Sequence, residues 1–332
     1  MGKRLLPALG LFLLSPLAGE FLLGNLPVTA LPALVVLAPL YGGGALLIRE
    51  LARRRGAGWP GMVLLAVAYG LVEEGLLTRS LFDPHFAGMD LASYAWLPGV
   101  GVSAWWASFV LGGVHAAGSV LAPIAVMEAL VPSRAEEPWL GRPGLVVAGV
   151  LYVLGAAATG LTNPDAYRPS AAQLVGAAVV AALLSVLALP RRPPATTPAG
   201  GAPRRAPGPW TVLGLTLVAG LAFWLAALPL DVLGAWPAVA ANLALYGAAY
   251  ALVARWARRA GWGLAQRLAL GAGWLLTYAW HSFPQPPALP ATPGVDLAGN
   301  VAFAVAAVAL LTVAWSRVRA AARGAAEEPV TL

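Results

Sequence analysis

The feature that most constrains this chain is a series of ten apolar runs, each close to the length that crosses a lipid bilayer. A helix needs about 20 apolar residues to span the hydrocarbon core. The expected spans are residues 5–23, 30–48, 61–77, 102–130, 145–161, 171–189, 211–230, 238–253, 268–280 and 297–315. None alternates as a β-barrel strand does, so we expect an all-α polytopic membrane bundle of about ten transmembrane helices.

The composition excludes most soluble classes of protein. Hydrophobic residues make up 59% of the chain and charged residues 11%, whereas a soluble domain carries about a quarter charged residues. A soluble enzyme, a disordered protein and a nucleic-acid-binding domain are therefore excluded, and membrane lipids are the expected surroundings. The chain has no cysteine, which excludes thiolate metal sites, disulfides and cysteine nucleophiles.

The basic residues predict the topology. With the N-terminus in the cytoplasm, ten alternating spans place all but two of the 21 Lys and Arg residues on the cytoplasmic side. The exceptions are Arg79 and Arg168. Because cytoplasmic loops are enriched in basic residues, both termini are expected to be cytoplasmic. The preference for Arg over Lys is typical of a GC-rich bacterial genome, so the expected location is the cytoplasmic (inner) membrane of a bacterium.

A segment rich in Pro, Gly and Arg divides the chain. Residues 190–209 read PRRPPATTPAGGAPRRAPGP, a composition typical of an extended cytoplasmic linker. It separates a six-helix membrane region at 1–189, which carries the polar site, from a four-helix membrane region at 210–316. Residues 317–332 are expected to form a cytoplasmic tail.

The main candidate site lies on the third and fourth spans. Ionisable side chains inside a bilayer are costly, so each one is a candidate functional residue. Glu73 and Glu74 lie in the outer part of the third span, Arg79 at its outer end and His115 in the fourth span. Consecutive helices tend to pack together. A carboxylate beside an imidazole suits general-base work on water, metal binding or proton transfer, and Arg79 could pair with a carboxylate.

Four residues are secondary candidates. Glu20 lies near the outer end of the first span, Asp83 and His85 lie in the following outer loop, and His281 closes the ninth span. A structural interpretation stands beside the functional one for every candidate, because interfacial and hydrogen-bonded polar residues also stabilise packing. No organic cofactor is indicated. A divalent metal, if one binds, would take Glu73, Glu74 and His115 as ligands.

Two further polar features at the predicted inner side have plain interpretations. Arg49 and Glu50 are expected to end the second helix and to act as a topology signal. Glu128 is expected to form an ion pair with Arg134 or with another inner arginine.

The motif around the glutamates resembles a known family. A Glu-Glu pair, then Arg, then a histidine on the next helix resembles the CPBP intramembrane proteases, which include CAAX prenyl endopeptidases and bacterial Abi-type relatives. The resemblance covers about 45 residues and implies Glu73 or Glu74 as the catalytic glutamate, Arg79 as the motif arginine and His115 as a histidine that orients water. Four residues rather than three separate Glu74 from Arg79, and Leu111 replaces the family's phenylalanine.

The first four spans have a second resemblance. Stretches such as YGGGALLIRE and EEGLLTRSLFDP are similar to those of an uncharacterised group of bacterial multi-pass membrane proteins. That likeness implies no activity.

Three functions follow as alternatives. The first is a membrane-embedded, peptidase-like hydrolase acting on a peptide or small molecule. The second is a proton- or cation-coupled transporter, because acidic residues at the outer mouth attract cations. The third is a structural or assembly protein whose polar residues hold helices together. The sequence gives no indication of the oligomeric state.

Overall fold

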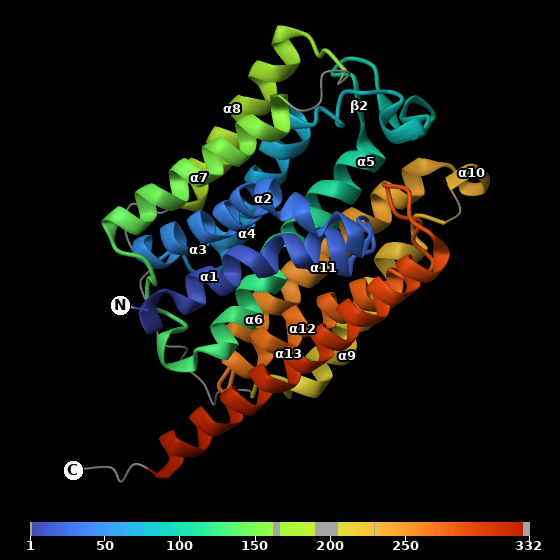
Figure 1. Ribbon diagram of the computed structural model, residues 1–332. Coiled ribbons are helices and arrows are strands. Elements are labelled where there is room, and N and C mark those ends of the chain that lie inside the picture. The colour runs from blue at the N-terminus through green and yellow to red at the C-terminus, as the bar shows by residue number, and fades with distance from the viewer. Residues whose placement is uncertain (1, 162–166, 190–204, 229, 328–332) are drawn as a thin grey trace.

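The computed structural model describes residues 2–161, 167–189, 205–228 and 230–327, which form a bundle of long helices (Figure 1). Within these residues, eight helices are long and apolar enough to cross a membrane. They are Leu5–Leu22, Val28–Arg55, Gly58–Leu77, Ala104–Leu130, Arg142–Leu161, Ala171–Ala188, Ala235–Ala257 and Pro293–Gly324. This confirms the predicted all-α polytopic membrane protein.

Two of the ten expected spans lie in helices outside this set of eight. The seventh run lies in α9 (Pro209–Leu225), which is apolar but has 17 residues. The ninth run lies in α12 (Leu264–His281), which has 18 residues and carries Gln266 and Arg267 near its start. These polar side chains and the terminal His281 lower the mean hydropathy of α12. Each of the ten expected runs therefore contains a helix, and eight described helices meet the length and composition of a span. The seventh run was expected to reach residue 230, but α9 ends at Leu225, and the fourth run begins in a strand at Val102–Ser103.

The first four spans are not uniform α-helices, because each contains a π-helical stretch: η1, η3, η4 and η7. Their elements are α1 (Gly2–Pro16), η1 (Leu17–Leu22), η2 (Val28–Ala33), α2 (Leu34–Leu37), η3 (Ala38–Gly42), α3 (Gly43–Arg55), α4 (Gly58–Val72), η4 (Glu73–Leu77), α5 (Ala104–Ser108), η7 (Phe109–Leu121) and α6 (Ala122–Leu130). The fourth span returns to α-helix at Ala122. Pro123 stands in the first turn of α6, where its missing N–H is tolerated.

The end of α3 corrects one expectation. Arg49 and Glu50 do not end the second helix, because α3 continues to Arg55 and both side chains are fully buried. The helix stops where Gly56 adopts the left-handed conformation, with φ of 65°. Glycine is favoured at this position because it carries no Cβ.

The remaining elements complete the bundle and the loop between the third and fourth spans. In that loop a two-stranded antiparallel hairpin pairs Trp96 with Ser103. The elements are η5 (Phe86–Gly88), η6 (Leu91–Ser93), β1 (Trp96–Leu97), β2 (Val102–Ser103), η8 (Pro132–Arg134), α7 (Arg142–Leu161), α8 (Ala171–Ala188), α10 (Leu230–Leu233), α11 (Ala235–Ala257) and α13 (Pro293–Glu327). In Figure 1, α7 and α8 lie along one edge of the bundle, and α9 and α13 along the opposite edge.

The two expected membrane regions pack against each other. The phenyl ring of Phe109 in η7 stacks on that of Phe223 in α9, with the ring centroids 4.8 Å apart. The Tyr278 hydroxyl of α12 donates to the Val114 carbonyl, 2.9 Å away. Most of the expected linker, residues 190–204, lies outside the described residues. α13 runs to Glu327, so helix extends into the expected tail at 317–332, whose last five residues are also not described.

Candidate functional site

Four π-helical segments supply the polar side chains of the candidate site. Glu20 lies in η1, Tyr41 in η3, Glu73 and Glu74 in η4, and His115 in η7. The widened hydrogen bonding is visible where the Thr78 N–H donates to the carbonyl of Glu73, five residues earlier, at 2.9 Å. Wider turns reduce the angle between consecutive side chains, so the adjacent glutamates reach one imidazole. Such segments occur frequently at functional sites.

Glu74 holds His115 by its Nε2 atom. The distance from His115 Nε2 to Glu74 Oε1 is 2.6 Å. The other carboxylate oxygen accepts hydrogen bonds from the hydroxyls of Thr78, at 3.0 Å, and Ser80. Ser80 is itself fixed by the Trp106 indole N–H, which donates to its Oγ at 2.9 Å. Both oxygens of Glu74 are therefore engaged, and the carboxylate orients the ring.

Glu73 faces the other nitrogen of the same ring. Its Oε2 lies 3.4 Å from His115 Nδ1, and neither atom has a hydrogen-bond partner among the described residues. The hydroxyl of Tyr69, one helical turn before Glu73, also has none. All three side chains are buried. Since unpaired polar groups inside a protein are costly, a water molecule or a substrate atom that contacts both Glu73 Oε2 and His115 Nδ1 would bind favourably. It would have to lie beside the two atoms, because a separation of 3.4 Å leaves no room between them.

Glu20 lies beside this cluster and is buried rather than exposed at the interface. Its carboxylate accepts from the Tyr41 hydroxyl and from the Asn25 amide, each at 2.5 Å. The Tyr41 ring lies 6.0 Å from the His115 ring between centroids. The site therefore contains a third carboxylate, from the first span.

The candidates indicated by the sequence were all acidic, basic or histidine side chains, so they did not include the tyrosines, the serine and the threonine near the glutamates. Tyr69 precedes Glu73 by four residues, a spacing that places two side chains on one helix face. That spacing was a usable signal. No sequence signal indicated the contacts of Tyr41 and Ser80, because these contacts depend on how the spans pack.

Arg79 does not pair with the glutamates. It follows η4 in a left-handed conformation, with φ of 64°, which turns the chain away from the helix axis. Its Nε has no hydrogen-bond partner, and it forms no ion pair with any described residue.

The secondary candidates other than Glu20 lie in separate environments. Asp83 accepts from the backbone N–H of His85 at 2.9 Å. The side chain of His85 is exposed and faces Asp90, with a nitrogen–oxygen distance of 3.9 Å. His281 stacks on Trp224, with ring centroids 3.4 Å apart, and its Nε2 lies 3.1 Å from Gln285 Oε1.

The geometry does not form a metal site within the described residues. No group of three or more His, Asp or Glu side chains there is arranged to hold a metal ion. The reason is visible in the contacts: Glu73 and Glu74 approach different nitrogens of His115 and so do not converge on one point. What the arrangement offers is an imidazole between two carboxylates, a group suited to moving protons.

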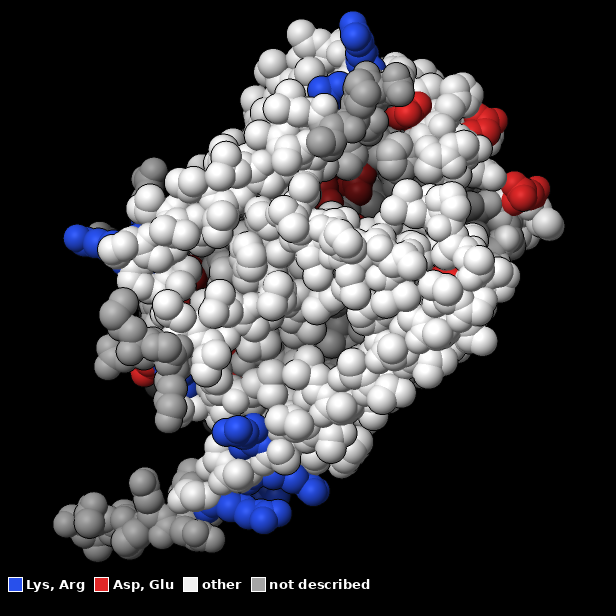
Figure 2. All heavy atoms as spheres, in the orientation of Figure 1, with Lys and Arg blue, Asp and Glu red and all other residues white. Residues whose placement is uncertain are grey.

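Some acidic atoms that lie below the surface can be seen from outside the molecule. Figure 2 shows acidic atoms at the floor of a hollow in a face formed mostly by uncharged residues. In this view basic residues lie near the C-terminal end of the molecule and also at its left side and top, and several exposed acidic residues lie at the upper right.

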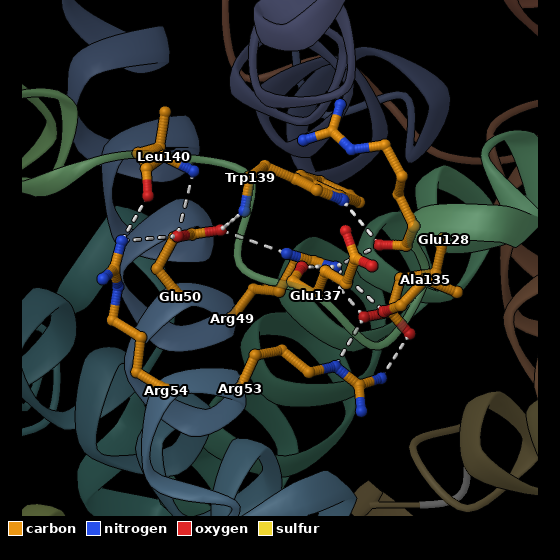
Figure 3. A network of polar contacts seen from close by, with 10 residues as sticks. Arg49, Glu50, Arg53, Arg54, Glu128, Ala135, Glu137, Trp139 and Leu140 are labelled. Atoms are coloured by element: carbon orange, nitrogen blue, oxygen red, sulfur yellow. Dashed lines mark hydrogen bonds and ion pairs between the residues drawn. The ribbon is translucent and has the colours of Figure 1, made fainter.

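A second polar cluster was not anticipated as a unit, and we call it the arginine network (Figure 3). Its charged members are Arg49, Glu50, Arg53, Arg54, Glu128 and Glu136. Arg49 is fully buried at its centre. Its guanidinium lies 3.0 Å from Glu128 and 3.1 Å from Glu50, and 3.3 Å from the centroid of the Trp139 ring. Glu128 also pairs with Arg53 at 2.6 Å, which confirms its expected ion pair with an inner arginine.

The backbone of residues 134–140 completes the arginine network. Arg49 Nη2 donates to the carbonyls of Ala135 at 2.9 Å and Glu137 at 3.0 Å. Glu50 accepts from the backbone N–H groups of Trp139 at 2.7 Å and Leu140 at 3.1 Å.

The exposed Glu136 extends the arginine network to the second half of the chain. Its carboxylate pairs with Arg53 and, at 2.5 Å, with Arg267 of α12. The network therefore ties α3, α6 and α12 together at one end of the bundle.

Comparison with known proteins places most of the chain in one family. A family model described as "Uncharacterized membrane protein family" matches residues 9–320. No curated protein and no solved structure matches the chain. The family model does not confirm the resemblance to the CPBP proteases. With the helical bundle described above, the match over residues 9–320 shows that this chain belongs to an uncharacterized family of membrane proteins.

Proposed function

We propose that this protein is a membrane-embedded hydrolase that uses acid–base chemistry at Glu73, Glu74 and His115. The observation that carries the proposal is the pair of unsatisfied, buried atoms, Glu73 Oε2 and His115 Nδ1, 3.4 Å apart. A water molecule bound beside these two atoms, in contact with both, would meet a proton acceptor and a proton donor at once. General acid–base catalysis requires such groups within hydrogen-bond reach of the reacting atoms.

Each residue has a separate role in this proposal. Glu73, whose Oε2 is free, takes a proton from the attacking water. The water oxygen forms the new bond to a carbonyl carbon, and the bond to the leaving group breaks. Protonated His115 supplies a proton to the leaving group, and Glu74 holds the ring by Nε2 so that Nδ1 points to the reaction. The substrate is a peptide or another carbonyl compound that enters the membrane.

We further propose that the site lies in the outer half of a bacterial cytoplasmic membrane, with both termini in the cytoplasm. The basic side chains near the C-terminal end support this orientation (Figure 2), because basic residues accumulate on the cytoplasmic side. A smaller group of basic atoms lies at the top of the view, beside exposed acidic residues.

Proton- or cation-coupled transport is a second candidate. It is supported by the burial of three carboxylates and a histidine in one cluster, the kind of group that relays protons in pumps and transporters. The arginine network joins α3, α6 and α12 by ion pairs, and a transporter open to one side requires such helices to be held together at its closed end. A structural role is the third alternative. It is separated from the other two by the thermal stability of variants that lack the buried polar side chains.

The test is hydrolysis by the full-length protein reconstituted in nanodiscs. The probes are a panel of internally quenched peptides with an apolar segment and a panel of para-nitrophenyl acyl esters. Glu73→Gln, Glu74→Gln and His115→Gln are each expected to lower the turnover of any probe cleaved by about 10²-fold or more. His85→Gln and Asp83→Asn, which alter loop residues outside the cluster, serve as matched controls with unchanged turnover.

Three outcomes separate the alternatives. Full activity in the Glu73→Gln or Glu74→Gln variant would contradict the hydrolase. Absence of turnover, together with proton-driven uptake of a solute by proteoliposomes that the same variants abolish, would establish transport. Lower melting temperatures in Glu74→Ala and His115→Ala, without turnover or flux in the unmodified protein, would leave a structural role.

A further inference from the structure

An apolar groove runs along the outside of the bundle between α3, α4, α7 and α8. Its volume is about 350 Å³, and leucine, alanine and valine side chains form most of its walls. The Ser185 hydroxyl in the wall donates to the carbonyl of Ala181 in its own helix at 2.8 Å, so it offers no free donor. The groove therefore suits an apolar occupant.

The groove lies at the depth of the hydrocarbon core. All four helices around it belong to segments that are long and apolar enough to cross a membrane. On the third span its lining extends from Leu65 to Leu76, a rise of about 17 Å at 1.5 Å per residue. That is more than half of the ~30 Å hydrocarbon thickness. An occupant with this shape and chemistry is a single hydrocarbon chain.

The side of the groove that α3 forms ends next to an exposed arginine, Arg55. Leu47 and Leu51 line the groove, and Arg55 follows Leu51 by four residues, on the same helix face. Arg55 is exposed and forms no ion pair with any described residue. The preceding Arg53 and Arg54 are both engaged in the arginine network. A basic residue at this level attracts the phosphate of an anionic lipid.

We propose that this groove binds one hydrocarbon chain of an anionic phospholipid whose phosphate pairs with Arg55. The proposal does not depend on the hydrolase proposed above. The two sites nevertheless share one side chain, because Tyr69 lines the groove while its ring lies 6.1 Å from the His115 ring between centroids. The absence of a side chain at Gly44 makes room for this ring: a Cβ there would lie 2.5 Å from Tyr69 Cε2.

The test measures lipid retention by the full-length protein. The protein is equilibrated with phosphatidylglycerol or phosphatidylcholine in detergent, and bound lipid is counted by native mass spectrometry. We expect one phosphatidylglycerol to be retained in preference to phosphatidylcholine. Arg55→Gln should weaken this binding about fivefold, the effect of removing one basic residue, and Ala182→Trp, which fills the groove, should abolish it.

Matched variants separate the groove from the general surface. Ala172→Trp alters the same helix, α8, outside the groove, and Arg317→Gln removes an exposed arginine from α13. Both should retain phosphatidylglycerol as the unmodified protein does. The proposal is overturned if Arg55→Gln and Ala182→Trp retain as much phosphatidylglycerol as these controls, or if both lipids are retained equally and Arg55→Gln changes neither.

A second measurement needs no substitution and therefore does not depend on the folding of Ala182→Trp. A phosphatidylglycerol with a photoreactive group on one acyl chain is crosslinked to the unmodified protein, and the labelled peptides are sequenced. Labelling should concentrate on α3, α4, α7 and α8. Labelling spread evenly over the lipid-facing helices would contradict the proposal.

Discussion

Arg49 is the residue whose environment departs furthest from what its position in the sequence indicates. An arginine near the end of an apolar run ordinarily extends its charge to the membrane surface. Here the side chain is fully buried, pairs with two carboxylates and donates to backbone carbonyls of residues 134–140. A planar guanidinium with five donors can satisfy this set, whereas an ammonium group cannot.

Arg49→Lys should therefore destabilise the protein although it keeps the charge. The lysine cannot reach Glu50, Glu128 and the carbonyls together, and a buried charge pair that loses a partner costs about 3–5 kcal/mol. The measurement is thermal unfolding in detergent, followed by tryptophan fluorescence. Arg317→Lys, an exposed substitution of the same kind, is the control. Equal melting temperatures for the two variants would show that the arginine network contributes little to stability.

At the scale of elements, close packing of helices depends on glycine residues, which have no side chain. In α9 a Cβ at Gly220 would lie 2.2 Å from the Thr277 hydroxyl oxygen of α12, whereas a Cβ at Gly214 would meet nothing within 4 Å. Small residues at a crossing let two membrane helices approach closely. The contact between α9 and α12 is therefore set by Gly220 rather than by the glycine one and a half turns earlier.

This difference gives a paired prediction within one helix. Gly220→Ala should destabilise the protein by about 1–3 kcal/mol, because an added methyl group in a filled interface forces its neighbours apart. Gly214→Ala should leave stability unchanged or raise it by up to about 1 kcal/mol, since alanine favours the helix. Denaturant unfolding in mixed micelles measures both. A larger loss for Gly214→Ala than for Gly220→Ala would contradict the described packing.

The elements also show how far the sequence could predict this molecule. Hydrocarbon thickness alone requires long apolar runs, so each of the ten expected runs contains a helix. The π-helical turns at Glu20, Tyr41, Glu73 and His115 could not be predicted, because a widened turn is stabilised by contacts with other spans. The meeting of Glu74 with His115 follows from the packing of consecutive helices, but the roles of Tyr69 and Ser80 required the structure.

At the scale of the whole molecule, the distribution of charge predicts which end faces the cytoplasm. The chain has no cysteine, so an introduced cysteine is its only thiol. In intact cells, Asp90→Cys in the outer loop should react with a membrane-impermeant maleimide. Arg317→Cys near the C-terminal end should react only after the membrane is permeabilised. Reaction of both, or of Arg317→Cys alone, in intact cells would contradict the proposed orientation.

The arginine network also has a consequence for how the chain is made. Its central ion pair joins Arg49 and Glu128, which are 79 positions apart. At about 5–20 residues per second, a ribosome needs roughly 4–16 s to synthesise that interval. During this time the second span carries Arg49 with only one of its two carboxylate partners, Glu50, because Glu128 has not yet been synthesised. Its charge must stay in the headgroup layer until the fourth span arrives, so the burial of Arg49 is a late event in biogenesis.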